Sequence, residues 1–156
     1  MKALIATDGS EPSTRAAHEA AALLHPDAEL QIVTVIPELE DPLETAGGFE
    51  GPLITEEEAQ EEHRDATRAG RAALRATLAE AGEPARTDLI EGDDPGRIIC
   101  ELAAERGVDV LVVGESEKGW FSRLIHGSVM EYAVKHAPCP VLVVRSTEHQ
   151  HDQQHQ

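Results

Sequence analysis

The most regular apolar run in the chain is Val108-Asp109-Val110-Leu111-Val112-Val113-Gly114. Its β-branched residues favour a buried strand, and the glycine at its end favours a turn. The pattern before this run is helical, because Asp94 suits the N-cap, Pro95 suits the first helical position and Gly107 follows the last apolar repeat. A helix that leads into a buried strand and a turn is typical of an α/β protein with a parallel sheet.

Strand and helix patterns alternate along the rest of the chain. Four further strands are predicted at residues 2–7, 28–36, 86–91 and 141–144, and the helices at 11–25, 55–81, 95–106 and 128–137. Thr55 and Ser128 each have a glutamate three residues later, which is the pattern of a capping box. The sequence therefore predicts a doubly wound α/β fold, a five-stranded and mainly parallel sheet with helices on both faces. One domain covers residues 1–146, and a polar, disordered tail is expected at 147–156.

The charge of the chain excludes several classes of partner. Lys and Arg number 13 against 30 Asp and Glu, a net charge of -17, so neither nucleic acid nor an anionic membrane surface is expected to bind. The N-terminus runs directly into a strand, which predicts an unexported, cytoplasmic protein. Cys100 and Cys139 lack the C-x-x-C spacing and are predicted to be reduced, buried thiols. No metal-ligand cluster is predicted.

Two loops are candidates for a ligand site. In a doubly wound sheet, ligands bind beyond the carboxyl ends of the strands where the strand order reverses. This rule points to Asp8-Gly9-Ser10 and to the loop at 114–128. Glycines in that second loop, with the helix that starts after Ser128, could present backbone N–H groups to a phosphate. The alternative is that Ser128 only caps the helix and Gly127 only turns the chain.

Two sharper motifs fail in the same loop. Gly114 and Gly119 have the spacing of a P-loop, but Trp120-Phe121 stands where Lys and Ser or Thr are required. Gly114-Glu115-Ser116 begins like a nucleophile elbow, but Lys118 replaces the final glycine. No activated nucleophile or placed general base appears, so no catalytic residue is predicted.

Two segments of the sequence resemble a known family. The opening Leu4-Ile5-Ala6-Thr7-Asp8-Gly9-Ser10, and the run from Gly127-Ser128-Val129 to His136-Ala137-Pro138-Cys139-Pro140-Val141-Leu142-Val143-Val144, are similar to universal stress proteins. The resemblance covers residues 1–145 and implies the adenine nucleotide α-hydrolase-like fold. It also implies a cytoplasmic, homodimeric regulator of the stress response that pairs through the last strand, at Val141, Leu142, Val143 and Val144.

The resemblance further implies a site for an adenine nucleotide, ATP or AMP. Magnesium could accompany the nucleotide, and no cofactor is obligatory. The implied site residues are Ala6, Thr7, Asp8, Val35, Val113, Gly114, Ser116, Glu117, Gly127, Ser128 and Val129. Asp8 would meet the ribose or a metal, whereas its plain structural role would be to cap the turn at Gly9-Ser10.

One position departs from the family pattern G-x2-G-x9-G-[ST]. Gly114, Gly127 and Ser128 match it, but Glu117 occupies the place of the second glycine. A carboxylate about 4 Å from a phosphate costs on the order of one to a few kcal/mol at a surface-like dielectric. AMP is therefore expected to suit the site better than ATP, unless Glu117 turns outward beside Lys118 or a divalent cation bridges the charges.

Two other functions stay open at this point. The first is a protein-interaction module of the same fold that works without nucleotide, with an unknown protein partner docking on the loop at 38–54. The second is a slow ATPase that uses Asp8, His126 and Ser128. The absence of an activated nucleophile from the sequence weighs against the enzyme.

Overall fold

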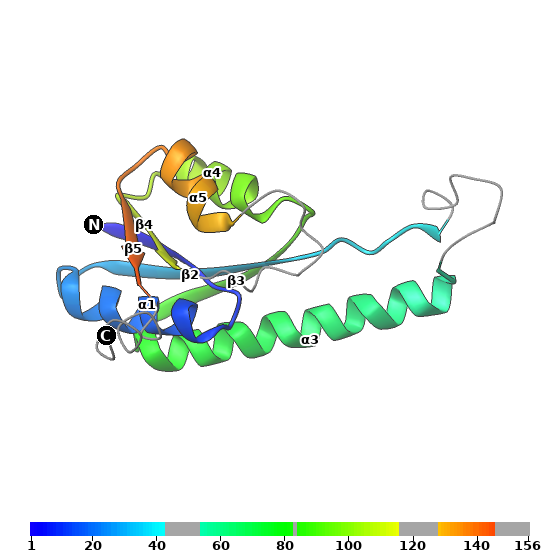
Figure 1. Cartoon of the computed structure of the whole chain (residues 1–156). Helices are drawn as coiled ribbons and strands as arrows, with labels where there is room; N and C mark the ends of the chain where they lie inside the picture. The colour runs from blue at the N-terminus through cyan, green and yellow to red at the C-terminus, as the bar shows by residue number, and fades with distance from the viewer. Residues whose placement is uncertain (43–53, 83, 116–127, 146–156) are drawn as a thin grey trace, which may run out of the picture.

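The computed structural model describes residues 1–42, 54–82, 84–115 and 128–145. Within them strands and helices alternate as the sequence predicts, and Figure 1 shows their arrangement. The elements are β1 (Lys2–Ala6), α1 (Glu11–Leu23), β2 (Glu29–Ile36), α3 (Glu56–Ala81), β3 (Ala85–Glu91), α4 (Pro95–Arg106), β4 (Val110–Gly114), α5 (Val129–His136) and β5 (Val141–Val144). The predicted tail at 147–156 lies outside the described residues.

The five strands form one sheet in the order β3-β2-β1-β4-β5. Every pair of neighbouring strands in this sheet is parallel, so the sheet is parallel throughout rather than mainly parallel. Ile5 in β1 lies between Ile32 of β2 and Val112 of β4. The chain therefore builds the sheet outward from β1 in one direction and then returns to add β4 on the other side. This reversal between β1 and β4 is the predicted place for a ligand.

Helices cover both faces of the sheet, as predicted. Figure 1 shows α1 and α3 on one face and α4 and α5 on the other. Because side chains alternate along a strand, Ala3 and Ile5 pack toward the first pair of helices, and Leu4 and Ala6 pack toward the second. Both hydrophobic clusters are built mainly of aliphatic residues that are fully buried. None of the helices in the described ranges is long and apolar enough to cross a membrane.

The caps predicted for α3 and α4 are confirmed, and at Ser128 one half of the predicted capping box is present, the hydrogen bond from Glu131 N. Thr55 and Glu58 form a reciprocal capping box at the start of α3, and Gly82 ends this helix with a φ of 81°. Asp94 caps α4, and its carboxylate accepts the backbone N–H of Arg97 at 3.3 Å. These caps satisfy backbone N–H groups that have no partner inside the helix.

Two predicted boundaries were wrong by two residues. Helix α1 ends at Leu23 rather than His25, because His25 precedes Pro26 and the residue before a proline avoids the helical conformation. Strand β4 begins at Val110 rather than Val108, because the backbone of Val108 takes part in the turn that caps the end of α4. Gly107 adopts the left-handed conformation there, and the Val108 N–H donates to the Ala103 carbonyl at 3.1 Å.

Candidate functional site

The carboxyl ends of β1 and β4 lie at the same edge of the sheet, where the strand order reverses. The turn at residues 7–10 follows β1, and Glu115 follows β4. Each segment is tied to a neighbouring strand, since Thr7 N donates to Val33 O and Glu115 N donates to Val144 O, both at 2.9 Å. The fold therefore brings together two segments that lie about a hundred residues apart in the sequence.

The Asp8 carboxylate holds the turn and the start of α1 together. Its Oδ1 atom accepts hydrogen bonds from Ser10 N at 3.0 Å, from the Ser10 hydroxyl and from the Ser13 hydroxyl at 2.6 Å. A carboxylate that accepts the backbone N–H two residues later forms an Asx turn. The structural role weighed for Asp8 in the sequence is thus present, and its carboxylate is fixed at the edge of the site.

The Thr7 side chain is fully buried and faces α3. Its Oγ1 atom lies 2.8 Å from Thr77 Oγ1 and accepts the Gly9 N–H at 3.0 Å. Gly9 has a φ of 80°, a conformation that favours glycine. Thr7 is a predicted nucleotide-binding residue, but the contacts of its hydroxyl are internal to the protein.

Gly114 has a packing reason to be glycine. A Cβ atom at this position would lie 2.9 Å from Ser13 N and would overlap the carbonyl group of Pro12. The first turn of α1 therefore lies directly against the end of β4. The contact explains the glycine without a ligand. It also holds Gly114 against Ser13, whose hydroxyl donates to the Asp8 carboxylate.

Four predicted site residues form an apolar floor beneath this edge. Ala6, Val35, Val113 and Val129 belong to one hydrophobic cluster, on the face covered by α4 and α5. Each is at most 5% exposed, so their side chains support the edge from below. Because these side chains are buried, a ligand would meet only their backbone groups, at the ends of β1, β2 and β4 and at the start of α5.

Glu115 is the acidic residue that follows the end of β4. One of its carboxylate oxygens, Oε2, is buried and has no hydrogen-bond partner among the residues that the structure describes. A buried and unpartnered carboxylate oxygen disfavours a second anion nearby and favours a hydrogen-bond donor or a cation. The Glu115 side chain is thus a candidate determinant of what binds at this edge.

Ser128 is the N-cap of α5, and its hydroxyl accepts the Glu131 N–H at 3.0 Å. This is the structural role weighed for Ser128 in the sequence. The remaining predicted site residues, Ser116, Glu117 and Gly127, lie outside the described residues, as does His126.

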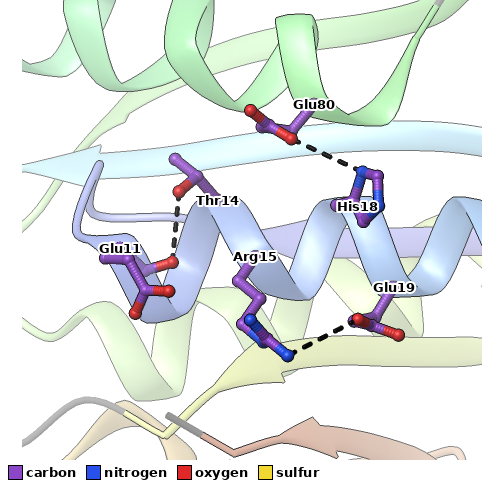
Figure 2. Close-up of a pocket in the computed structure, with 6 residues that line it drawn as sticks. All are labelled: Glu11, Thr14, Arg15, His18, Glu19 and Glu80. Carbon is purple, nitrogen blue, oxygen red and sulfur yellow. Dashed lines mark hydrogen bonds and ion pairs between the residues drawn. The ribbon is translucent and has the colours of Figure 1, made fainter. Parts of the chain in front are cut away.

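An open hollow lies elsewhere, between α1 and α3 (Figure 2). It is lined by Glu11, Thr14, Arg15, His18, Glu19 and Glu80, and it contains none of the predicted nucleotide-binding residues. His18 lies 3.5 Å from Glu80, and Arg15 lies 3.9 Å from Glu19. The carboxylates of this hollow would repel a phosphate. In the described part of the chain, no group of three or more His, Cys, Asp or Glu side chains could hold a metal ion.

Comparison with known proteins decides the family. The profile of the Universal stress protein family matches residues 1–145. The universal stress protein MJ0531 of Methanocaldococcus jannaschii is 34% identical over 148 residues, which cover 92% of this chain and 81% of the relative. This chain belongs to the universal stress protein family.

Solved structures of universal stress proteins share the fold. Hypothetical protein MJ0577, the subject of a structure-based assignment of biochemical function, has a TM-score of 0.67 and 26% identity, and the match covers 93% of this chain and 95% of that one. A family protein from Arabidopsis thaliana, solved with AMP bound, has a TM-score of 0.63 and 20% identity over 96% and 94% of the two chains. The predicted adenine nucleotide α-hydrolase-like fold is confirmed.

Sequence reasoning missed the part of α3 in this universal stress protein that touches the Asp8 turn. Thr77 and Ala73 contact the turn, and neither belongs to the family's nucleotide pattern. One feature of the sequence pointed to Thr77. It lies on the stripe of small and apolar residues that α3 buries, among Gly70, Ala73, Leu74 and Ala81. A threonine in such a stripe needs a hydrogen-bond partner.

Proposed function

We propose that this universal stress protein is a homodimeric regulatory protein that binds an adenine nucleotide where the strand order reverses. The ligand would lie beyond β1 and β4, against the Asp8 turn and above the apolar floor. The proposal depends most on one observation, that the Asp8 turn and the end of β4 lie at the same edge of the sheet. The AMP bound to the Arabidopsis neighbour supports it, as a property of a protein with the same fold.

The charge at this edge favours a nucleotide with few phosphates. Glu115 has a buried carboxylate oxygen with no hydrogen-bond partner in the described ranges of the chain, and Glu117 follows two residues later in the sequence. Each additional phosphate would add negative charge near the Glu115 carboxylate. AMP should therefore bind more tightly than ATP, and magnesium should narrow the difference because it neutralises phosphate charge.

The homodimer is proposed to form along the outer edge of β5. The sheet has two edge strands, β3 and β5. Charged residues of β3, such as Arg86, Asp88 and Glu91, discourage the addition of another strand, whereas β5 consists of Val141, Leu142, Val143 and Val144. All four β5 residues remain partly exposed in the single chain. An uncharged and exposed edge strand suits pairing with a second copy.

Calorimetric titration with AMP, cyclic AMP and ATP, with and without magnesium, tests the ligand. Three variants sharpen the test. Glu115→Gln removes the charge of this partly buried side chain and keeps its shape, and Glu117→Gly restores the family glycine. Glu105→Gln removes an equal charge from an exposed position near the end of α4, which lies where β4 begins rather than where it ends.

We expect wild-type protein to bind AMP more tightly than ATP. Glu115→Gln should raise the ATP affinity by about tenfold and the AMP affinity by less, and Glu105→Gln should change neither. No binding of any nucleotide by the wild type, Glu115→Gln or Glu117→Gly would refute the nucleotide proposal. The interaction module without nucleotide would then be the better account of this universal stress protein.

A further inference from the structure

We propose that Thr77 of α3 is a positioning residue for the ligand site, because it holds the Asp8-Gly9 turn through a chain of hydrogen bonds whose two hydroxyl groups are buried. The inference rests on the proposed function only for the identity of the ligand. The structural part, that α3 sets the conformation of the turn, stands on contacts within the described residues.

The hydrogen bonds form a relay with a defined direction. The Ala73 carbonyl can only accept, and Thr77 Oγ1 lies 2.7 Å from it, so the Thr77 hydroxyl donates its hydrogen there. Thr7 must then donate to Thr77 across their 2.8 Å contact, since each hydroxyl has a single hydrogen. The Thr7 oxygen accepts the Gly9 N–H at 3.0 Å. The relay therefore runs from Gly9 through Thr7 and Thr77 to Ala73.

A second contact, between Gly9 and Ala73, packs the same turn directly against α3. A Cβ atom at Gly9 would lie 2.8 Å from the Cβ and 3.1 Å from the Cα of Ala73, so the turn backbone rests on the helix. Ala73 and Thr77 are one helical turn apart on the buried face of α3. One short stretch of α3 thus meets the turn twice, once by packing and once through the relay.

The part of the relay formed by Thr7 and Thr77 has few alternatives because it is shielded from water. Thr7 and Thr77 are both 0% exposed, so no bulk water can replace a lost partner. Without the Thr77 hydroxyl, the buried Thr7 hydroxyl would lack its acceptor. If the Thr7 side chain rotated toward another acceptor, it would lose its hydrogen bond with the Gly9 N–H. Asp8 lies between Thr7 and Gly9, so movement of Gly9 would displace the carboxylate proposed to face the nucleotide.

The test compares two substitutions at one position. Thr77→Val keeps the shape and removes the hydroxyl, whereas Thr77→Ser keeps the hydroxyl and removes a methyl group. A third variant, Ile32→Val, removes a methyl group from the hydrophobic cluster on the α1 and α3 face, at a residue that pairs with Ile5 rather than with a residue of the turn. Each variant is examined for its AMP dissociation constant by titration, for the amide NMR signals of Gly9 and Ser10, and for its thermal midpoint.

We expect Thr77→Val to weaken AMP binding by about fivefold or more and to shift the Gly9 amide signal. Thr77→Ser should restore both to near the wild-type values. Ile32→Val should lower the thermal midpoint with the AMP affinity and the Gly9 signal unchanged. Unchanged AMP affinity in Thr77→Val, or an unchanged Gly9 signal, would overturn the inference.

Failure of the proposed function is a separate outcome. If wild-type protein binds no AMP, the nucleotide proposal falls, and the Gly9 and Ser10 signals alone decide whether Thr77 positions the turn. If Thr77→Val does not fold, the double variant Thr7→Val/Thr77→Val replaces both hydroxyls by apolar groups, which cores tolerate better than one unpaired hydroxyl. Compared with Thr7→Val alone, the double variant should shift the Gly9 signal no further, because Thr77 acts on Gly9 only through Thr7. A further shift would contradict the relay.

Discussion

At the end of β4, a side chain as small as a methyl group would collide with the first turn of α1. The collision partners at Gly114 are backbone atoms of Pro12 and Ser13, which cannot rotate away. Gly114→Ala should therefore lower the free energy of unfolding by about 1–3 kcal/mol, measured by urea denaturation. If this variant unfolds like the wild type but loses nucleotide binding, the glycine serves the ligand and the packing explanation is wrong.

The two cysteines give a second prediction for single residues. Both are free and Cys100 is buried, but the prediction of a buried thiol is wrong for Cys139, which is partly exposed because it precedes the edge strand β5. Burial raises the pKa of the Cys100 thiol, and the nearby Cys139 raises it further; burial is also the main cause of the raised pKa of Cys139. At pH 8 iodoacetamide should alkylate Cys100 more slowly in the folded protein than in the urea-unfolded chain, because this thiol is buried and the thiolate is the reactive form. Equal rates in the two states would contradict this.

The same raised pKa values fix the sign of a pH effect. The unfolded chain ionises its thiols first as the pH rises, and the folded state resists ionisation until its higher pKa is reached. The thiols' contribution to stability is therefore fully present below the ordinary thiol pKa and is lost as the pH rises through the raised values. A Cys100→Ala/Cys139→Ala variant should show a smaller loss of stability over this alkaline range.

Among the elements, those with strong local patterns were predictable from the sequence. The buried strand at Val110–Gly114 and the capped helix α3 depend on neighbours in the sequence, and both were found. The errors occurred at the boundaries of elements, as at Val108, whose N–H donates a hydrogen bond to Ala103 O at the end of α4 instead of to a neighbouring strand. The relay between Thr7 and Thr77 was beyond prediction, because it depends on a contact between residues 70 positions apart.

Helix α3 gives a prediction at the scale of an element. Thr55 Oγ1 accepts the Glu58 N–H, and Glu58 Oε2 accepts the Thr55 N–H, both at 3.1 Å. Thr55→Ala should destabilise the start of α3 by about 0.5–2 kcal/mol, seen as faster hydrogen exchange at the Glu58 amide, and Thr55→Ser should not. AMP affinity should not change, because Thr77 lies near the far end of the helix. A matching loss of affinity would show that the whole helix responds as one unit.

For the whole molecule, the two edges of the sheet differ in chemistry, and this difference makes the dimer testable. Pro140 O and Val144 O accept hydrogen bonds from Leu111 N and Glu115 N, on the β4 side. Every second residue of β5 therefore directs both its N–H and its C=O toward β4. The N–H of Val143 therefore points outward, where a partner strand would accept it. At the opposite edge Gly92 N donates inward to Ile36 O, so the N–H of Thr87 in β3 also points outward.

Proline removes an outward N–H and is tolerated on an edge strand. Val143→Pro should therefore convert the protein from a dimer to a monomer, while the matched variant Thr87→Pro should remain dimeric. Analytical ultracentrifugation measures this directly, since a dimer has twice the 16.8 kDa mass of one chain. A dimer that persists in Val143→Pro but dissociates in Thr87→Pro would move the interface to β3. A monomeric wild type at micromolar concentration would refute the dimer itself, and any nucleotide response would then have to arise within a single chain.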